Sequence, residues 1–433
     1  MSVTRHADIL IIGNGGAAAH TVMGLRSAGY EGPIDLIADT VDAPFNPMLL
    51  PYLLKGDIER DACHPFGLDF YEKHKVDCRL GSPVVTLDAE AKTATLANGS
   101  RVEYQQCLIA TGAGCIVPNL PGLRDASRTV TFRTKACGAR IEEAVKTGKS
   151  AVVLGASLVG AKLAEVLALK GLTVTLIDLA DRILPGAAHI ESSLTLQKLL
   201  EQRGITVRLN QRLSGAVESA DQIHLHFEGE KEIATDFACV CTGVKPNIDF
   251  LDPGQVHRQT GLLVDPTCRT SVDGLFAAGD AAEGFNLLTG KHQWFGLWGK
   301  ACYQGRTAGL NMAGRKAAYP GTLPEYITPI AGRIFAGLGD VNHHGPENQT
   351  FIYKDRDDLV ETILTFDHGV LVGANLLAGL DNLALLKTAL IRRLDLSDLL
   401  ESGRTHLPEI LTAIVNRSRV DIRTSSVWGG VDY

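Results

Sequence analysis

The sequence predicts an α/β protein with two Rossmann-like dinucleotide-binding domains and a C-terminal α+β domain. The first observation behind this prediction is an apolar strand, a glycine-rich turn and the start of a helix at residues 7–20, and the second is the same pattern at residues 150–165. The third is a strand-rich stretch that gives way to two amphipathic helices after residue 321. One glycine-rich turn is weak evidence by itself, but two in one chain predict two bound nucleotides.

The first turn has the spacing G-x-G-x-x-A, which is typical of a phosphate-binding loop. Gly13 lets the chain reverse after the strand, and Gly15 lets backbone N–H groups approach a pyrophosphate. Ala18 lets the helix lie close to its strand. For this stretch alone a purely structural role is the alternative, because strand–turn–helix joints are often rich in glycine. The recurrence of the pattern favours the nucleotide.

Composition and charge indicate a globular protein without a broad nucleic-acid or membrane surface. The chain has 433 residues, of which 45% are hydrophobic and 21% are charged, and this length allows two or three domains. A net charge of −7 argues against binding to nucleic acid or to an anionic membrane. No uncharged apolar run approaches about 18 residues, and the N-terminus has no cleavage site. We therefore expect no membrane span and a cytoplasmic location.

The nine cysteines indicate free thiols rather than a metal centre. They form no C-x-x-C or C-x4-C pair, and their number is odd. Cys239 and Cys241 point the same way along one predicted strand, where buried packing is the expected role. We expect reduced thiols, no zinc or iron–sulfur site and no other bound metal.

The region after the first helix supplies further parts of the first domain. A strand at residues 33–39 ends at Asp39, whose carboxylate suits the ribose hydroxyls of an adenosine; the alternative is a solvated acid. The apolar, proline-containing residues 43–57 cannot form a regular strand and are the candidate floor of an active site. Residues 81–104 are predicted to form antiparallel strands with an Asn98-Gly99 turn.

Two later strand ends consist of small residues. The ATG sequence at residues 110–112 would let a backbone approach a flavin or an adenine closely. At Gly279 a strand ends so that Asp280 and the following helix N-terminus can meet a polyol and a phosphate. Trp294 and Trp298 are expected near the start of that helix.

Residues 124–245 repeat the nucleotide-binding pattern. Gly155, Ser157 and Gly160 form the second turn, and the next strand ends at Asp178. This acid would accept both hydroxyls of an unphosphorylated ribose and would repel a 2′-phosphate. The sequence therefore favours NADH over NADPH.

The last part of the chain is predicted to be a separate α+β domain. Residues 351–378 are strand-rich with a turn at 367–369, and residues 380–394 and 407–418 have the pattern of amphipathic helices. We expect the apolar faces of these helices to form core or a dimer interface, and contact with a membrane is the alternative.

With both glycine turns, the ATG strand end and the AAGDA segment in this order, the chain resembles the pyridine nucleotide–disulfide oxidoreductase flavoproteins. The resemblance extends over residues 1 to about 315. It implies an FAD-binding domain that is interrupted by an NAD-binding domain. The implied limits are 1–123 and 246–320 for the FAD domain, 124–245 for the NAD domain and 321–433 for a C-terminal interface or dimerisation domain.

The resemblance also implies roles for individual residues. It assigns FAD binding to Gly13, Gly15, Asp39, Thr111 and Asp280, and NADH binding to Gly155, Ser157, Gly160 and Asp178. The further cofactor-binding candidates are Gly16, Ala18, Pro47, Val84, Ala110, Gly112, Gly243, Gly279 and Trp298.

Within this family the chain looks closest to the reductases that lack a redox disulfide, namely the rubredoxin and ferredoxin reductases and the flavin domain of the NADH-nitrite reductases. Those carry a stretch like P-Y-x-R-P-x-L-S-K, in which Pro47 here takes the arginine position and Tyr52 the lysine position. Met48 stands where the coenzyme A disulfide reductase and NADH peroxidase branch has its single cysteine. Lys162 replaces the glutamate that usually faces the nicotinamide.

This paired replacement makes Lys162 and Tyr52 the candidate catalytic residues. The hypothesis is that Lys162 lies near flavin N5 and the nicotinamide, with Tyr52 as a hydrogen-bond partner, and that its charge stabilises the anionic reduced flavin. The alternative is an exposed helix lysine that pairs with Glu165, an interaction worth only about a few tenths of a kcal/mol.

The expected function is that of an FAD-dependent oxidoreductase that takes hydride from NADH. Without a cysteine relay, the electrons would pass directly to a protein partner of the iron–sulfur, ferredoxin-like type. One alternative is an NADH oxidase or a reductase of a quinone or another small molecule. The other is a subunit or sensor that binds FAD and NADH but turns over slowly, with the C-terminal domain as its interaction surface or homodimer interface.

Overall fold

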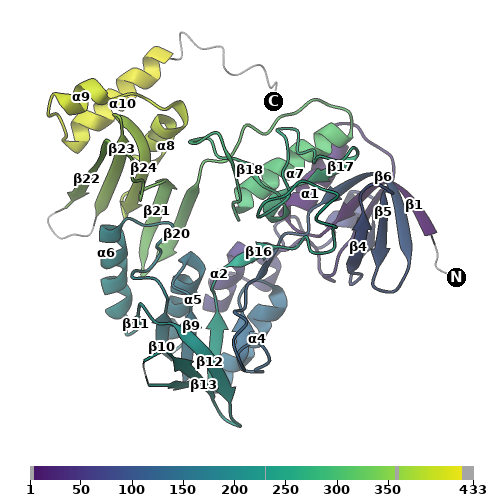
Figure 1. The fold of residues 1–433 in the computed structure, drawn as a ribbon, viewed down its shortest axis with the longest axis horizontal. Helices are drawn as coiled ribbons and strands as arrows, with labels where there is room; N and C mark the ends of the chain where they lie inside the picture. The colour runs from purple at the N-terminus through teal and green to yellow at the C-terminus, as the bar shows by residue number, and fades with distance from the viewer. Residues whose placement is uncertain (1–3, 230, 356–359, 422–433) are drawn as a thin grey trace. The chain divides into compact units, whose positions relative to one another are not determined.

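The computed structural model describes residues 4–229, 231–355 and 360–421, and the chain forms two compact units (Figure 1). Unit 1 comprises Met1–Gly148 and Cys239–Thr322, and unit 2 comprises Lys149–Ala238 and Leu323–Tyr433. Each unit is therefore built from two separate segments of the chain.

Unit 1 is built on a mixed sheet whose parallel part carries the first glycine turn. The strand order is β3-β2-β1-β6-β5-β4, and β17 also pairs with β6. The pairs around β1, β2, β3 and β17 are parallel, whereas β4–β5 and β5–β6 are antiparallel. The strands are β1 (Thr4–Ile12), β2 (Ile34–Ile37), β3 (Val76–Arg79), β4 (Val84–Asp88), β5 (Thr93–Leu96), β6 (Arg101–Ile109) and β17 (Leu275–Ala277).

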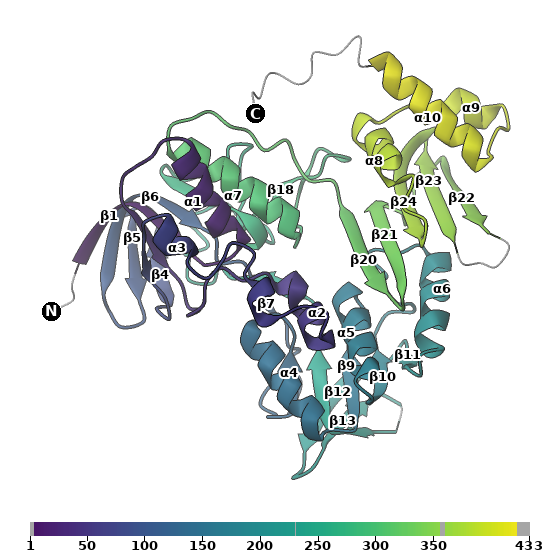
Figure 2. The ribbon, with the colours of Figure 1, turned by 180° about the vertical axis from the view of Figure 1, so that it is seen from behind.

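Small residues let α1 (Gly16–Ser27) and α7 (Trp298–Met312) pack very closely against each other. A Cβ atom on Gly305 would lie 2.2 Å from the Ala17 carbonyl oxygen, so no larger residue fits there. The Thr21 hydroxyl donates a hydrogen bond of 2.8 Å to the Gly305 carbonyl across the same contact. Figures 1 and 2 show the two helices side by side.

The rest of unit 1 consists of short helices and small strand pairs. The prediction that residues 43–57 form no strand is confirmed, because this stretch contains a 3₁₀ turn followed by α2. The Asn98-Gly99 turn between β5 and β6 is also confirmed. The elements are η1 (Pro47–Leu49), α2 (Leu50–Lys55), η2 (Arg60–Cys63), α3 (Phe70–Lys73), β7 (Ala113–Cys115), β8 (Thr129–Thr131), α4 (Lys135–Thr147), β16 (Val244–Pro246), η3 (Gly279–Ala281), β18 (Gly284–Phe285) and β19 (His292–Gln293).

Unit 2 contains a second parallel arrangement with its own glycine turn. Strand β10 pairs in parallel with β9 and with β11, and β12, β13 and β14 form an antiparallel sheet. The elements are β9 (Ser150–Leu154), α5 (Leu158–Leu169), β10 (Thr173–Ile177), α6 (Ile190–Glu201), β11 (Thr206–Arg208), β12 (Leu213–Glu218), β13 (Ile223–Phe227) and β14 (Ile233–Thr235), while β15 (Phe237–Val240) spans the boundary between the two units.

The C-terminal part of unit 2 is an antiparallel sheet of order β20-β21-β24-β23-β22 that is followed by three helices. Helix α8 packs on β24, and α10 packs on α8 (Figure 2). The elements are β20 (Glu325–Ile330), β21 (Arg333–Gly339), β22 (Asn348–Lys354), β23 (Glu361–Asp367), β24 (Val370–Leu377), α8 (Leu383–Arg392), α9 (Ser397–Glu401) and α10 (Leu407–Asp421).

The predicted fold class is confirmed, and both predicted C-terminal helices are present as α8 and α10. The start of α7 differs from the prediction, because the helix begins at Trp298 and does not include Trp294. The preceding residues pair as β19 with β18, and the Trp294 indole N–H donates to the Asp280 carbonyl at 2.8 Å. These bonds keep the segment extended up to the helix.

Candidate functional site

The first glycine turn is shaped by backbone contacts that only glycine permits. Gly13 has a φ of +113°, and its N–H donates to the Ile37 carbonyl at 2.8 Å. A Cβ atom on Gly13 would lie 2.1 Å from the Ala110 carbonyl oxygen. The turn therefore lies directly against the end of β6, and only glycine fits at this position.

The start of α1 has the properties of an anion-binding site. Gly15 is the N-cap of α1, and a Cβ atom placed on it would meet no protein atom within 4 Å. The first turn of the helix carries no acidic residue that would repel a phosphate. Gly16 lies beneath the Trp298 ring, since its Cβ would be 2.8 Å from that indole, and Ala18 is fully buried. The open side at Gly15 lies beside the first amides of the helix, which have no acceptor within the helix, and it fits a pyrophosphate.

Asp280 lies at the end of β17, in the turn η3. Its carboxylate forms an ion pair of 2.5 Å with Arg133, and the aspartate side chain is 14% exposed. The preceding Gly279 has a φ of +71°, and its N–H donates to the Gln304 side chain at 3.0 Å. This turn therefore holds a carboxylate and a guanidinium close together at the carboxyl end of the parallel strands, where ligands of open α/β sheets bind.

Lys300 is buried beneath this turn. It is 4% exposed, and its ammonium group donates to the carbonyls of Gly279, Ala282 and Phe295 at 3.0, 2.6 and 3.1 Å. Burial lowers the pKa of Lys300 to about 8, although the charge of Asp280 opposes this shift. The three donors of the ammonium group thus satisfy three backbone acceptors and hold the turn in place.

The strand end at residues 110–112 is tied to the chain segment that follows β16. The Thr111 hydroxyl donates to the Asn247 carbonyl at 2.6 Å, and the Asn247 amide donates to the Thr111 carbonyl at 3.1 Å. The Asn247 backbone N–H donates to the Gly112 carbonyl at 2.9 Å. This exchange of bonds makes the strand end a rigid part of unit 1.

The other predicted residues of unit 1 lie on several elements. Asp39 is exposed two residues after β2, Pro47 opens η1, and Tyr52 is half-buried in α2. Val84 begins β4 and packs against the core, and Gly243 is exposed with a φ of +119°. Within unit 1, Gly13 contacts Ala110, and Gly16 contacts Trp298. Val84 instead packs against the hydrophobic core.

The second turn, in unit 2, is built like the first. Gly155 has a φ of +106°, and its N–H donates to the Ile177 carbonyl at 2.7 Å, which matches the Gly13–Ile37 bond. Ser157 is the N-cap of α5 and accepts a bond from the Gly160 N–H. The carboxylate of Asp178 accepts bonds from the N–H groups of Ala156 and Ala180. An acid is thereby held beside the turn at the end of β10.

Lys162 lies in the second turn of α5. Its ammonium group donates to the Thr328 hydroxyl at 3.2 Å. The carboxylate of Glu165, its predicted surface partner in the alternative interpretation, accepts bonds from Arg203 and from the Ala331 N–H. Glu165 therefore ties α5 to the β20–β21 hairpin within unit 2.

Neither a metal centre nor a membrane helix is found in the part of the chain that the structure describes. There, no group of three His, Cys, Asp or Glu side chains is arranged to hold a metal ion. In the same residues, no helix is long and apolar enough to cross a membrane. Cys239 and Cys241 are 0% and 8% exposed, in agreement with their predicted packing role.

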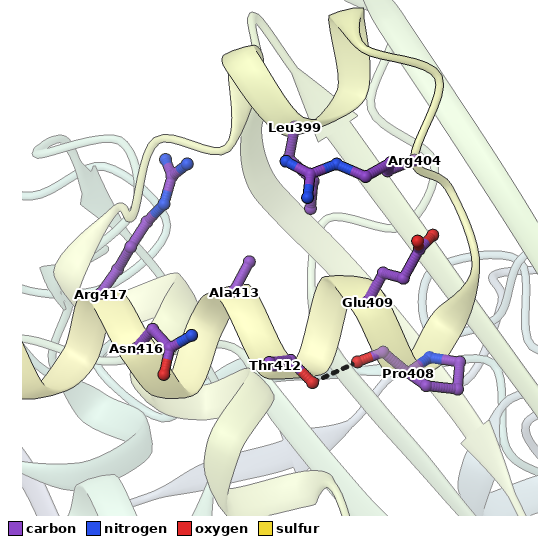
Figure 3. Close-up of a pocket in the computed structure, with 8 residues that line it drawn as sticks. All are labelled: Leu399, Arg404, Pro408, Glu409, Thr412, Ala413, Asn416 and Arg417. Carbon is purple, nitrogen blue, oxygen red and sulfur yellow. Dashed lines mark hydrogen bonds between the residues drawn. The ribbon is translucent and has the colours of Figure 1, made fainter.

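A hollow of about 440 Å³ in unit 2 lies between α9 and α10 (Figure 3). One side of it is the turn of α10 in which the Thr412 hydroxyl donates to the Pro408 carbonyl at 2.7 Å. None of the predicted site residues lines it. Its lining residues are Leu399, Arg404, Pro408, Glu409, Thr412, Ala413, Asn416 and Arg417.

Sequence reasoning missed three residues that the structure places at the candidate site of unit 1. Arg133 pairs with Asp280, Asn247 bonds to the hydroxyl and the carbonyl of Thr111, and Lys300 supports the turn at Gly279. The spacing of Asn247 after β16 is a weak signal, because Asn247, Arg133 and Lys300 make most of these contacts with parts of the chain that are distant in the sequence. A lysine in the first turn of a helix resembles any exposed lysine in a sequence.

Comparisons with known proteins agree with this geometry. The family model described as pyridine nucleotide-disulphide oxidoreductase matches residues 7–305. The epsilon subunit of NADH-dependent phenylglyoxylate dehydrogenase from Aromatoleum evansii is 31% identical over 338 residues, which are 77% of this chain and 80% of that protein. The ferredoxin–NAD(+) reductase subunit of the benzene 1,2-dioxygenase system from Pseudomonas putida is 28% identical and covers 78% of this chain and 82% of its own.

A similar fold is found among solved structures. The water-forming NADH oxidase from Lactobacillus brevis, solved with NADH bound, matches with a TM-score of 0.86. The match covers 96% of this chain and 99% of that one at 20% sequence identity, so it supports the fold alone.

Proposed function

Because the chain belongs to the pyridine nucleotide-disulphide oxidoreductase family and is an FAD-dependent NADH oxidoreductase, we propose that it delivers electrons to a protein partner of the iron–sulfur, ferredoxin-like type. The observation that carries the proposal is the pair of matching glycine turns, at Gly13 and at Gly155, each closed by the same backbone bond. The name of the Pseudomonas relative, a ferredoxin–NAD(+) reductase subunit, supports the class of partner.

FAD supplies the redox chemistry when it is bound, because it accepts hydride from NADH and releases electrons to an acceptor. The chain's own residues bind and orient it. The open amides at Gly15 fit the pyrophosphate, and the Asp280 carboxylate, which Arg133 holds in place, fits the polyol. With Met48 in the position of a redox cysteine, the proposal needs no thiol relay.

We further propose the domain limits that the resemblance implies, with FAD bound by residues 1–123 and 246–320 and NADH by residues 124–245. In this proposal residues 321–433 form an interface with another protein chain, which can be a second copy of this chain in a homodimer. Limited proteolysis of the holoenzyme tests these limits, because cleavage should fall at the proposed domain boundaries and not within the domains.

Rapid-mixing experiments test the proposed acceptor. NADH should reduce the flavin at least as fast as the enzyme turns over. A [2Fe–2S] ferredoxin should then reoxidise the reduced enzyme at least about tenfold faster than dissolved oxygen or menadione does. Oxygen or menadione as the fastest acceptor would identify an oxidase or a small-molecule reductase. Reduction by NADH that is too slow for turnover would identify a binding subunit or sensor.

The nucleotide preference is a separate prediction. We expect NADH to be the better donor by at least about tenfold in kcat/KM, or roughly 1.4 kcal/mol, because a 2′-phosphate would meet the carboxylate of Asp178. Asp178→Asn removes the charge and keeps an oxygen acceptor for one of the two amides, those of Ala156 and Ala180, and it should raise the efficiency with NADPH.

The matched control is Asp39→Asn, which removes the acid at the corresponding strand end of the first turn. This change should leave the ratio of the two kcat/KM values as it is in the parent enzyme. Equal efficiency of the parent enzyme with NADH and NADPH would contradict the role of Asp178.

Lys162 is proposed to assist hydride transfer through its charge. Lys162→Met should slow the reduction of the flavin by NADH at least about tenfold or lower the flavin potential, because a cation favours the anionic reduced flavin. Lys170→Met, at the exposed end of the same helix, is the control and should behave as the parent. Unchanged kinetics and an unchanged flavin potential would contradict this role for Lys162.

A further inference from the structure

Four of the nine cysteines gather in unit 1 near the start of α4. Cys115 lies on β7, Cys137 in the first turn of α4, and Cys239 and Cys241 at the end of β15 and just beyond it. Their thiols are close enough for the charge of one to raise the pKa of another. Cys239 and Cys241 are buried, whereas Cys115 and Cys137 are partly exposed.

Cys137 occupies a position in which a helix favours an anion. Thr134 is the N-cap of α4, and its hydroxyl accepts a bond from the Cys137 N–H at 3.2 Å. In return the Cys137 sulfur accepts from the N–H of Thr134, so the thiol takes the place of the acid in a capping box. The hydroxyls of Thr131 and Thr134 both lie 3.1 Å from the sulfur.

These bonds make Cys137 different from the other cysteines. Burial raises the pKa of its thiol, but the bonds from Thr131, Thr134 and the Arg133 N–H outweigh burial, so the pKa falls below its ordinary value. Burial raises the pKa of the other eight cysteines. The charges of Cys137 and of the other three thiols of the cluster act on one another, and the nearest cations along the sequence are Arg133 and Lys135.

Cys115 is the available second thiol. Its sulfur also bonds to the Thr131 hydroxyl, which therefore lies between the two sulfur atoms. The two sulfur atoms therefore share one hydroxyl group as a hydrogen-bond partner.

We propose that Cys137 is a peroxide-sensitive thiol and that Cys115 is its resolving partner. The Cys137 thiolate attacks hydrogen peroxide, the O–O bond breaks, and the sulfur is oxidised to a sulfenic acid while the peroxide is reduced to hydroxide. The Cys115 thiolate then attacks the Cys137 sulfur, an S–S bond forms, and the hydroxyl group leaves as water after protonation. Two thiols and one peroxide thus give one disulfide and two waters.

The site is independent of the proposed electron acceptor, but it lies in a segment with contacts to the candidate FAD site. Arg133 pairs with Asp280, and Lys135 pairs with Asp42 at 2.7 Å. Oxidation at Cys137 therefore acts on a segment whose neighbouring residues are paired with Asp280 and with Asp42.

Mass spectrometry of the peroxide-treated holoenzyme tests the proposal. After exposure to hydrogen peroxide and alkylation of the remaining thiols, the parent should contain a Cys115–Cys137 disulfide that dithiothreitol reverses. Cys115→Ser should instead accumulate a sulfenic acid at Cys137, which dimedone traps, and Cys137→Ser should form neither product. Cys302→Ser is the control and should behave as the parent, because burial raises the pKa of that half-buried thiol to about 11.

A second measurement needs no variant of the cluster. At pH 7.5 iodoacetamide should label Cys137 in the parent at least about tenfold faster than Cys302, since the thiolate is the reacting form. Labelling of Cys137 no faster than Cys302 would overturn the proposal, as would a peroxide-treated parent in which Cys137 stays reduced while Cys302 is oxidised.

Discussion

Replacement of Gly15 by leucine is expected to weaken FAD binding at least about a hundredfold, or roughly 2.7 kcal/mol, while the fold stays intact. No protein atom lies within 4 Å of a Cβ at this position, so the new side chain meets no protein obstacle there. It would fill the space beside the α1 amides that a pyrophosphate needs. Flavin absorbance after gel filtration, and titration of the apoprotein with FAD, measure the effect.

Two other glycines separate loss of the cofactor from loss of the fold. Gly186→Leu is the matched control, since Gly186 also has no atom within 4 Å of its Cβ and lies in unit 2. It should retain FAD. Gly13→Ala should instead destabilise unit 1, because its Cβ would lie 2.1 Å from the Ala110 oxygen. Full retention of FAD by Gly15→Leu would contradict the placement of the pyrophosphate.

Because of Lys300, the free energy of unfolding is expected to rise by about 3 kcal/mol between pH 8 and 10.5. Burial lowers the pKa of Lys300 to about 8 in the folded state, against an ordinary value of 10.5. Between these values the unfolded chain binds more protons than the folded one, so stability rises with pH in this window. Below pH 8 the full cost of burying the charge is present, and above 10.5 it is lost.

Urea unfolding of the parent and of Lys300→Met at several pH values checks this prediction. The free energy of unfolding of the parent minus that of the variant should rise by about 3 kcal/mol between pH 8 and 10.5, because the methionine does not titrate. At neutral pH the variant leaves the carbonyls of Gly279, Ala282 and Phe295 without their donor. Lys170→Met, which removes an exposed lysine, is the matched control.

The sequence predicted the parts of the fold that depend on local pattern. Both glycine turns could be recognised because a tight turn between a strand and a helix limits its residues within a few positions, and Gly13 and Gly155 indeed have positive φ. The proline-rich stretch before Tyr52 and the Asn98-Gly99 turn were predictable for the same reason.

The start of α7 was harder to predict, because the residues before it are compatible with a helix. Their conformation is decided by the pairing of β19 with β18 and by the bond from Trp294 to Asp280. Neither contact can be predicted from the local sequence.

What the sequence determined by itself is therefore the class of protein: the α/β fold, the two nucleotide turns and the acids that follow them. The tertiary structure alone decided which side chains act together at the site. Arg133 reaches Asp280, Asn247 binds Thr111, and Lys300 is buried. The physical reason is that a turn is limited by the conformations of adjacent residues, whereas an ion pair or a buried amine depends on segments that only folding brings together.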